Sequence, residues 1–194
     1  MIHDIFKIPV YQKKLDLDLK KLNVFCNDFQ KTNISREISN LGGYQSKELN
    51  NDSELLKNLG TQIEKHASLF AKEFINNEHQ HISNCWFNVN YYKDSNSPHV
   101  HPRSEIAGVI YIKAPSDCGS ITFLHPIEDL ISFYDCDMNI KNFNSYNSHC
   151  WEFIPEENVI YLFPAWLKHS VQPNLNKNEE RISFSFNTEQ MLNE

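Results

Sequence analysis

Apolar residues recur every three or four positions in one stretch of the chain, residues 53–74. There the sequence SELLKNLGTQIEKHASLFAKEF places Leu56, Ile63 and Phe70 on one side of a helix. Ser53 is a good N-cap, because its hydroxyl can accept a hydrogen bond from a free backbone N–H of the first turn. Polar residues fill the opposite side, so the pattern predicts an amphipathic helix that packs on a sheet.

A second helix is predicted earlier in the chain, from Leu15 to Gln30, after a short apolar stretch at residues 5–11. The pair Gly42-Gly43 then indicates a turn between the two helices. We therefore expect the first 80 residues to form a helical support for the rest of the protein.

After Asn77 the apolar period changes from 3.6 residues to two. In CWFNVNYY, residues 85–92, side chains alternate as they do in a strand with one buried face. Further short segments follow between Gly, Pro, Asn and Asp residues: HVH, GVIYIKA, SITFL, CWEFI, NVIYLF, HSVQ and RISFSFN. Short strands between such turns are typical of an antiparallel sandwich or jelly roll rather than a parallel α/β sheet.

The length of 194 residues fits one domain of ordinary size. We expect a single domain over residues 1–194, with the helical support in 1–80 and a jelly-roll core in 81–190. The expected fold class is therefore mainly β with N-terminal helices. The polar stretch 126–148 is predicted to be a long loop, and such loops commonly determine selectivity for a substrate.

The composition excludes several classes of protein. Hydrophobic residues make up 40% of the chain, enough for a packed core, so a disordered chain is not expected. A formal net charge of −7 disfavours nucleic-acid binding, which needs a basic surface. The sequence shows no apolar run long enough for a membrane span and no signal-peptide pattern. The five cysteines include no CxxC pair, which suits reduced thiols and a cytoplasmic location.

Two histidines lie two positions apart in the segment SPHVHPRSE. On a strand, His99 and His101 would leave the same face with attachment points roughly 6.6 Å apart, close enough to share a metal ion. His169 follows the distant segment LFPAWLK. Two nearby histidines and a third from another strand can form a metal site inside a jelly roll. From the spacing alone, these histidines can belong either to a metal site or to a solvent-exposed strand edge.

Arginine is rare in this chain, which contains only Arg36, Arg103 and Arg181. The segment RISFSFN begins with Arg181 and alternates polar with apolar residues. If two antiparallel strands are joined by the NLNKNEE turn, Arg181 and His169 can face the same cavity. An arginine beside a metal implies a ligand with a carboxylate. The alternative is a surface ion pair between Arg181 and an acid such as Glu179, which contributes little to stability.

Four segments resemble a family of 2-oxoglutarate- and Fe(II)-dependent oxygenases of marine bacteria and cyanophages: GGYQSK, WFNVNYYKDSNSPHVHPRSEIAGVIYIKAP, GSITFLHP and YLFPAWLKHSVQPN…ERISFSFN. The resemblance covers residues 35–187. It implies a double-stranded β-helix in which a facial triad holds Fe(II) and 2-oxoglutarate chelates the iron. The implied reaction consumes O₂, releases succinate and CO₂, and hydroxylates an unidentified substrate.

The resemblance also implies roles for individual residues. It makes His99 the first histidine of the triad, His169 the distal histidine, and Arg181 the residue that binds the distal carboxylate of 2-oxoglutarate in a bidentate contact. Further residues of the cosubstrate pocket are expected at Asn88, Tyr111 and Ser183.

One position departs from the usual triad, which has a carboxylate two residues after the first histidine. This chain has His101 there. Three arrangements are open: His101 binds the metal directly, Glu105 supplies the carboxylate as the runner-up ligand, or His101 supports the other ligands. Three neutral imidazoles would leave the charge of Fe(II) uncompensated, so iron affinity is expected to be low until 2-oxoglutarate binds.

The same residues support two other hypotheses. HxHxxxE and a distant histidine resemble the metal motif of cupins, in which His99, His101, Glu105 and His169 would act together without 2-oxoglutarate. Such a protein would be a different metal-dependent enzyme or a binding module. A non-catalytic member that keeps the fold as an interaction module is also open. The place of Arg181 distinguishes the first two: inside the cavity it supports an oxygenase, and on the outer surface it supports a cupin.

Overall fold

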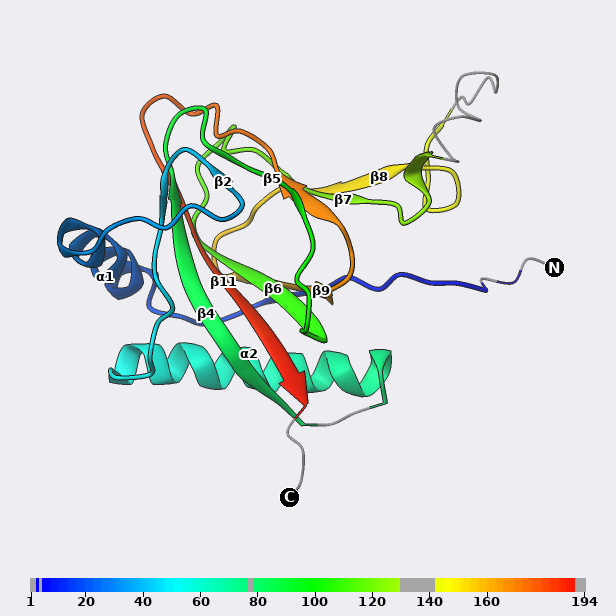
Figure 1. Cartoon of the computed structure of the whole chain (residues 1–194), viewed down its shortest axis with the longest axis horizontal. Helices are drawn as coiled ribbons and strands as arrows, with labels where there is room; N and C mark the ends of the chain where they lie inside the picture. The colour runs from blue at the N-terminus through cyan, green and yellow to red at the C-terminus, as the bar shows by residue number, and fades with distance from the viewer. Residues whose placement is uncertain (1–2, 4, 77–78, 130–141, 191–194) are drawn as a thin grey trace.

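The computed structural model describes residues 3, 5–76, 79–129 and 142–190. Over these residues it contains helices and strands arranged as in Figure 1. In chain order they are β1 (Tyr11–Lys14), α1 (Leu19–Thr32), β2 (Asn40–Leu41), β3 (Tyr44–Gln45), α2 (Glu54–Phe74), β4 (Gln80–Asn90), β5 (Ser95–His99), β6 (Ile106–Lys113), β7 (Ile121–Leu124), β8 (Cys150–Phe153), β9 (Val159–Pro164), β10 (His169–Val171) and β11 (Arg181–Gln190). Neither described helix is both long and apolar enough to span a lipid bilayer.

The strands form two antiparallel sheets. The larger sheet has the order β1-β9-β6-β11-β4-β3, and the smaller has the order β2-β5-β10-β7-β8. Figure 1 shows β5, β7 and β8 in one layer above β4, β6 and β11 in the other. The predicted class, mainly β with a jelly-roll core and N-terminal helices, is confirmed.

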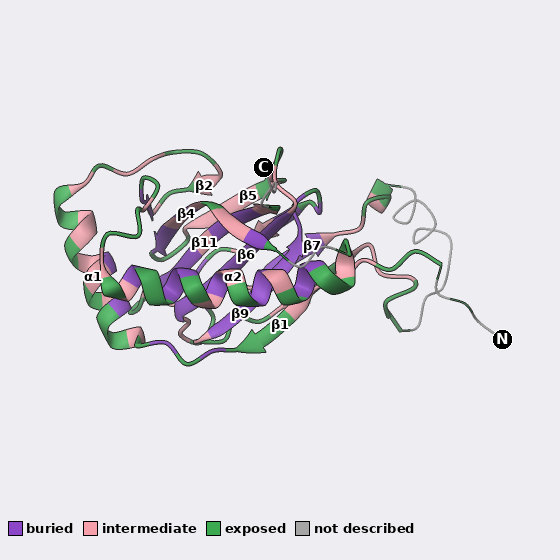
Figure 2. Ribbon diagram, turned by 90° about the horizontal axis from the view of Figure 1, so that it is seen from below, coloured by how far each residue is buried: buried purple, intermediate pink, exposed green. Residues whose placement is uncertain are grey.

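Helix α2 confirms the helix predicted over residues 53–74. Its N-cap is Ser53, whose Oγ accepts a hydrogen bond from the backbone N–H of Leu56 at 3.2 Å. The buried side of the helix, including Ile63, shares one apolar cluster with Phe87 of β4. Figure 2 shows α2 lying across the larger sheet with buried residues on the side that faces the strands. The helix therefore covers the outer face of that sheet.

Helix α1 begins at Leu19, four residues later than predicted. Asp18 is the N-cap, since its Oδ1 accepts a hydrogen bond from the backbone N–H of Lys21 at 3.1 Å. The residues before it are held in an extended conformation, because the backbone N–H of Leu15 donates to the carbonyl of Asn158 at 2.7 Å. This contact with a distant part of the chain outweighs the local helical pattern.

The first 80 residues contribute strands as well as helices. Strand β1 pairs with β9 and β3 pairs with β4, so these two strands form both edges of the larger sheet. Strand β2 pairs with β5 at one edge of the smaller sheet. The segment expected to be a helical support therefore also extends both sheets.

The larger sheet is buried on both faces. Along β6, Ile110 and Ile112 belong to the apolar cluster beneath α2, whereas Val109 and Tyr111 belong to the cluster between the sheets. Successive side chains of a strand point to opposite faces, which explains the alternation. A polar side chain on the inner face of this sheet is consequently enclosed between two layers.

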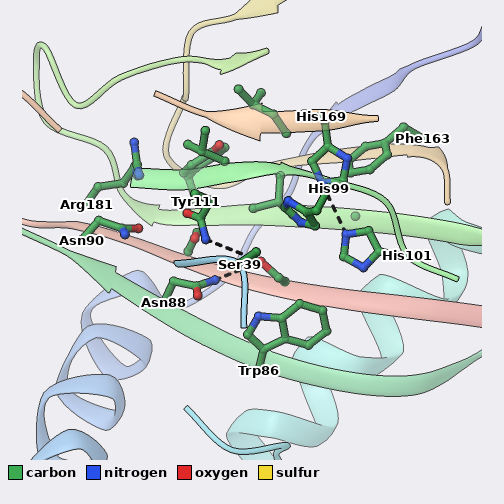
Figure 3. Close-up of a pocket in the computed structure, with 17 residues that line it drawn as sticks. Ser39, Trp86, Asn88, Asn90, His99, His101, Tyr111, Phe163, His169 and Arg181 are labelled. Carbon is green, nitrogen blue, oxygen red and sulfur yellow. Dashed lines mark hydrogen bonds between the residues drawn. The ribbon is translucent and has the colours of Figure 1, made fainter. Parts of the chain in front are cut away.

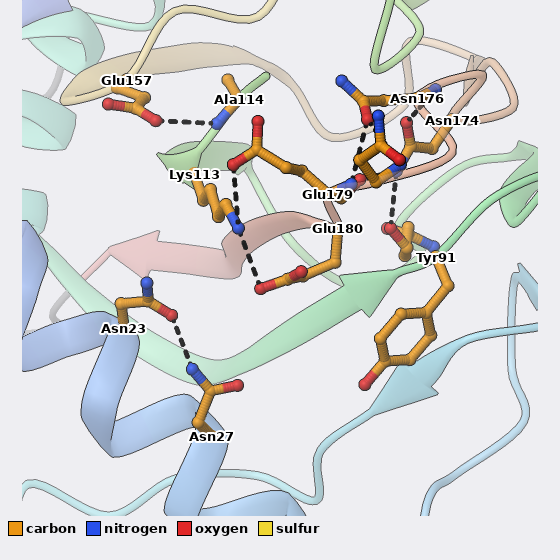
Figure 4. Close-up of polar contacts among 12 residues, drawn as sticks. Asn23, Asn27, Tyr91, Lys113, Ala114, Glu157, Asn174, Asn176, Glu179 and Glu180 are labelled. Atoms are coloured by element: carbon orange, nitrogen blue, oxygen red, sulfur yellow. Dashed lines mark hydrogen bonds and ion pairs between the residues drawn. The ribbon is translucent and has the colours of Figure 1, made fainter. Parts of the chain in front are cut away.

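Polar contacts fix the ends of the strands at one edge of this inner face. Lys113 lies at the end of β6. It forms ion pairs with Glu179 at 3.3 Å and with Glu180 at 3.1 Å, and these two residues come directly before β11 (Figure 4). The side-chain amide of Asn174 donates to the backbone carbonyls of Glu179 at 3.0 Å and Asn90 at 2.9 Å. The last residue of β4 is thus joined to the segment that leads into β11.

One other predicted segment differs from the structure, and another is only partly described. The segment HVH is not wholly a strand, because β5 ends at His99 and His101 lies in the following turn. Pro102 has no N–H for a strand ladder, and Arg103 has a positive φ of 66° that turns the chain. The predicted loop 126–148 lies partly outside the described residues, and its described ends contain no strand.

Candidate metal centre

Three histidines converge in the structure. His99, His101 and His169 each offer one ring nitrogen, and these atoms lie within 4.8 Å of one another. The register of the smaller sheet explains this, because His169 of β10 is the cross-strand partner of His99 of β5. His101 reaches the same point from the turn after β5. The backbone N–H of His101 donates to the carbonyl of Ala165 at 2.9 Å. The grouping indicated by the spacing is therefore present. Of the two nearby histidines, His99 and His101, only His99 lies on a strand.

Backbone carbonyls orient two of these rings. The Nδ1 of His99 lies 2.8 Å from the carbonyl oxygen of Ser97, and the Nδ1 of His169 lies 2.9 Å from that of Leu167. A carbonyl only accepts, so each Nδ1 carries the hydrogen and each Nε2 keeps its lone pair. The Nε2 atoms of His101 and His169 are 3.3 Å apart. Nε2 of His101 is thus close enough to the lone pair of His169 to bind the same cation once it is deprotonated.

Burial keeps the imidazoles neutral. It lowers the pKa of His169 to about 3, with a smaller contribution from the charge of His99, and it lowers the pKa of His101 to about 4. The pKa of His99 is also lowered by burial, partly opposed by its hydrogen bond to Ser97. At neutral pH all three rings are therefore in the deprotonated form that binds metals.

Aromatic side chains fix the rings from outside. Phe163 packs edge-on against His169 with the ring centroids 4.6 Å apart, and Trp86 stacks over His101 with the centroids 6.0 Å apart. These contacts restrict the rotation of both imidazoles and keep water away from part of the cluster. A metal ion here would be held in a partly enclosed site with aromatic rings on two sides.

A cavity extends from the histidines between the two sheets (Figure 3). The histidines come from the smaller sheet and its turn, whereas the opposite wall is the inner face of β4, β11 and β6. On that wall Arg181 is the cross-strand partner of Asn90, and Ser183 is the partner of both Asn88 and Tyr111. Because positions two apart on a strand share a face, all five side chains face the cavity together.

Arg181 lies inside this cavity and is only 1% exposed. Its Nη1 donates to the backbone carbonyls of Cys118, of Gly119 at 3.5 Å and of Gln172 at 3.0 Å. Its Nη2 is buried and has no hydrogen-bond partner in the protein. Nη1 is thus already used by the backbone, so a fork made of both Nη atoms is not available to a ligand, whereas Nη2 is open.

No acidic side chain is among the described residues that line the cavity. A buried guanidinium without a carboxylate partner is costly, so this site is suited to an anion. Further buried polar atoms lack partners on the same wall, namely Asn88 Oδ1, Asn90 Nδ2 and Tyr111 Oη. Burial also raises the pKa of Tyr111, so its phenol stays protonated and can donate. The donors on this wall, namely Nη2 of Arg181, Nδ2 of Asn90 and Oη of Tyr111, fit a carboxylate ligand.

Glu105 lies elsewhere. Its Oε2 accepts a hydrogen bond from Nε2 of Gln80 at 2.7 Å, and it is not among the described residues that line the cavity or form the histidine cluster. The cupin hypothesis required Glu105 at the metal and Arg181 on the outer surface. The structure places both residues otherwise.

Sequence reasoning missed Asn90 and the backbone anchors of Arg181. The position of Asn90 could have been found, because it lies two residues after Asn88 on the same strand and must share its face. The carbonyls of Cys118 and Gln172 had no signal in the sequence, since any residue supplies a carbonyl. Ser183 was expected in the pocket, and it lines the cavity with 6% exposure.

The jelly roll and its histidine cluster define a metal-binding protein of the double-stranded β-helix class. A family model described as "Putative 2OG-Fe(II) oxygenase" matches residues 84–187, more than half of the chain. The chain belongs to this family and is an Fe(II)- and 2-oxoglutarate-dependent oxygenase, with O₂ as the second cosubstrate. None of the curated proteins compared matches the chain.

Several solved structures share the fold. A prolyl-4-hydroxylase from Pseudomonas putida is 15% identical with a TM-score of 0.66, and the match covers 95% of this chain and 94% of that one. The viral collagen prolyl hydroxylase of Paramecium Bursaria Chlorella virus-1, solved as a 2-oxoglutarate complex, is 12% identical with a TM-score of 0.59 and coverage of 94% and 96%. HygX from Streptomyces hygroscopicus, with nickel and 2-oxoglutarate bound, is 9% identical with a TM-score of 0.63 and coverage of 95% and 84%. At these identities the likeness shows the fold alone.

Proposed function

We propose that this oxygenase binds Fe(II) through His99, His101 and His169, binds 2-oxoglutarate with its distal carboxylate at Arg181, and hydroxylates a substrate still to be identified. One observation carries the proposal. A single cavity joins three convergent neutral imidazoles at one end to a buried guanidinium with a free Nη2 at the other (Figure 3). This is the arrangement that a dicarboxylate chelating a metal requires.

The residues of the chain bind and orient the reactants. His99 and His169 present their Nε2 lone pairs from rings fixed by backbone carbonyls, and Arg181 offers Nη2 from a guanidinium fixed at Nη1. Tyr111 and Ser183 line the wall between these two ends. When bound, iron and 2-oxoglutarate supply the oxidising chemistry, in which O₂ is consumed and 2-oxoglutarate is converted to succinate and CO₂.

His101 takes the place of the usual carboxylate ligand in this proposal. Its Nε2 is 3.3 Å from that of His169, whereas the carboxylate of Glu105 is hydrogen-bonded to Gln80. An imidazole is an established type of ligand for iron. The resulting ligand set is uncharged, which makes the anionic cosubstrate part of the charge balance at the metal.

Turnover of 2-oxoglutarate tests the proposal. Protein reconstituted with Fe(II) without oxygen and then exposed to O₂ should convert 2-oxoglutarate to succinate in an iron-dependent reaction. His169→Ala and Arg181→Ala should lose this reaction. Arg103→Ala is the matched control, because Arg103 is exposed in a turn and does not line the cavity. Undiminished turnover in Arg181→Ala would contradict the carboxylate assignment.

Metal analysis separates a catalytic protein from a non-catalytic one. Reconstituted protein should hold close to one Fe(II) per chain when 2-oxoglutarate is present. A content far below that, with 2-oxoglutarate supplied, would favour an interaction module that keeps only the fold. The same sample shows whether the histidine cluster has the affinity that its geometry suggests.

We also propose a cytoplasmic location and the working layout of one domain, with residues 1–80 supporting a core in 81–190. The described cysteines Cys26, Cys85, Cys118 and Cys150 are all free, which is consistent with a reducing compartment. The resemblance to oxygenases of marine bacteria and cyanophages stays a prediction about origin. Fractionation of the native host would test the location.

A further inference from the structure

We propose that Asn90 is a third donor to the distal carboxylate of 2-oxoglutarate, beside Nη2 of Arg181 and the hydroxyl of Tyr111. The proposal deepens the function given above and rests on it. It assigns a role to a residue of β4 that would determine which 2-oxo acid the enzyme accepts. The role is positioning and selection of the cosubstrate.

The first step is the placement of Asn90. It is the cross-strand partner of Arg181, so the two side chains leave adjacent strands on the same face. Figure 3 shows Asn90 and Arg181 at one end of the cavity and the three histidines at the other. The exposed fraction of Asn90 is 1%, so solvent does not satisfy its side chain.

The second step is the state of its amide. Nδ2 of Asn90 is buried and has no hydrogen-bond partner in the protein. The backbone of Asn90 is held separately, because its carbonyl accepts from Nδ2 of Asn174 at 2.9 Å. The strand end is thus fixed without the side chain of Asn90, which leaves that side chain free for a ligand. Buried donors in native proteins nearly always have an acceptor, and an unpaired one at the wall of a cavity suggests an absent ligand.

The third step is the count of donors and acceptors. A carboxylate has two oxygens that can accept about four hydrogen bonds in total. Arg181 cannot supply a two-Nη fork, because Nη1 is occupied by the carbonyls of Gln172 and the Cys118–Gly119 segment. The acceptor positions of the carboxylate that Arg181 leaves open can take other donors. The unpaired donors at hand on this wall are Nδ2 of Asn90 and Oη of Tyr111.

The neighbouring Asn88 shows the contrast. Its Nδ2 already donates to Oγ of Ser185 at 3.2 Å, and its unpaired atom is the acceptor Oδ1. An acceptor would repel a carboxylate, so Asn88 suits an N–H or O–H group of a ligand instead. Of the two asparagines on this face of β4, Asn90 is the one with a donor available.

Selectivity follows from these unpaired donors. A 2-oxo acid without a distal carboxylate would leave Nη2, Nδ2 and the phenol of Tyr111 buried and unsatisfied. A site built to hydrogen-bond a ligand group discriminates strongly against the analogue that lacks it. 2-Oxopentanoate has the chain length of 2-oxoglutarate but a methyl group in place of the carboxylate. It is the probe that isolates the distal contact.

The experiment measures the affinities of both acids for Mn(II)-loaded protein by competition calorimetry. In Asn90→Ala the affinity for 2-oxoglutarate should fall about tenfold or more. The affinity for 2-oxopentanoate should change little, so the ratio of the two affinities falls. Asn90→Asp keeps the shape but faces the carboxylate with another carboxylate, and it should reduce the ratio further. Since Asn90→Asp is isosteric, it also serves if Asn90→Ala does not fold.

Asn187→Ala is the control for loss of a buried amide. Asn187 lies on β11, pairs with Asn84 at 2.8 Å and is outside the described lining of the cavity, so the ratio should stay at the wild-type value. An unchanged ratio in both Asn90 variants overturns the inference while the wild type still binds Mn(II) and 2-oxoglutarate. If the wild type binds neither, the proposed function itself fails, and the two failures are distinguishable.

Discussion

His99 and His169 lie directly opposite each other across the β5–β10 pair, with ring centroids 4.4 Å apart. Each ring donates from Nδ1 to the backbone carbonyl two residues earlier, Ser97 for one and Leu167 for the other. The same local arrangement thus orients two candidate ligands on separate strands. Their orientation depends on backbone geometry rather than on a neighbouring carboxylate.

The uncharged ligand set predicts that metal and 2-oxoglutarate bind cooperatively. Three imidazoles would hold the cation without any negative charge, and Arg181 adds a positive charge nearby. The dianion supplies the missing charge, and by linkage each ligand raises the affinity of the other by the same factor. Calorimetric titration with Mn(II) should show binding about tenfold tighter, or more, when 2-oxoglutarate is present.

Variants of His101 test the electrostatic origin of that cooperativity. His101→Asp supplies a charge at the ligand position, so Mn(II) binding without 2-oxoglutarate should tighten relative to His101→Asn, and the gain on adding 2-oxoglutarate should shrink. His101→Asn has nearly the same shape as the aspartate but no charge. If 2-oxoglutarate tightened Mn(II) binding equally in His101→Asp and His101→Asn, charge would not be the cause of the cooperativity.

Arg181→Lys should impair both cosubstrate binding and stability. A lysine keeps the charge, but its ammonium cannot reach the carbonyls of Cys118 and Gln172 and the cavity at the same time. We expect 2-oxoglutarate affinity to fall about ten- to hundredfold and the melting temperature to drop by several degrees. Calorimetry and thermal unfolding measure the two effects. Arg36→Lys is the control, since Arg36 is 40% exposed and lies 3.8 Å from Glu48; 2-oxoglutarate affinity as high in Arg181→Lys as in Arg36→Lys would refute the prediction.

His66 should make stability depend on pH. Burial, together with Lys65 and Lys13, lowers the pKa of His66 below its ordinary value of 6.5, and its Nδ1 lies 2.8 Å from Oη of Tyr11. The unfolded chain therefore binds a proton at a higher pH than the folded protein does. Stability from this group is fully present above about pH 6.5 and is lost as the pH falls toward the lower folded pKa.

Thermal unfolding between pH 8 and pH 5 checks this prediction. The melting temperature of the wild type should fall below about pH 6.5, and His66→Gln should show a shallower fall because glutamine does not titrate. His3→Gln removes an exposed histidine and is the control. Parallel pH profiles for the wild type and His66→Gln would exclude the role of His66.

Gly108→Ala should destabilise the protein, whereas Gly60→Ala should not. A Cβ on Gly108 would lie 2.4 Å from Cζ of Phe186 and 2.7 Å from Cδ2 of Leu162, both in the packed core. Overpacking of this kind costs about 1–3 kcal/mol. A Cβ on Gly60 of α2 meets nothing closer than 3.5 Å, so alanine there should stabilise the helix by about 0.5–1 kcal/mol.

A double-mutant cycle identifies the cause of the Gly108 effect. If the clash with the Phe186 ring is responsible, Phe186→Leu combined with Gly108→Ala should be more stable than the sum of the single changes predicts. Denaturant unfolding of the four proteins measures the coupling. Strict additivity would mean that the strain lies elsewhere.

Periodicity predicted the elements well because it reflects burial. The helix over 53–74 and the strand over 85–92 each bury one face against a packed layer. The apolar residues of the sequence mark that face. The sequence placed His169 and Arg181 in one cavity by pairing their strands, but β10 and β11 lie in different sheets, and the two side chains line the same cavity from opposite sheets. For His101 the sequence left three arrangements open, and in the structure its ring reaches the cluster from a turn.

Contacts between distant segments could not be predicted from the sequence pattern. Leu15 is extended because it pairs with Asn158, and Glu105 is hydrogen-bonded to Gln80, partners that no local spacing indicates. The free donor of Asn90 is visible only when β4 and β11 are in register. Local rules predict which face a residue occupies, whereas its partner depends on the assembled sheets.

The three backbone carbonyls that hold Nη1 of Arg181 matter for protein engineering. They come from the Cys118–Gly119 turn and from Gln172, so one guanidinium joins these segments to β11 and also reaches into the cavity. Substituting Arg181 to accommodate a different cosubstrate would loosen the scaffold along with the pocket. A redesign for another 2-oxo acid should therefore begin at Asn90 and Tyr111 and leave Arg181 unchanged.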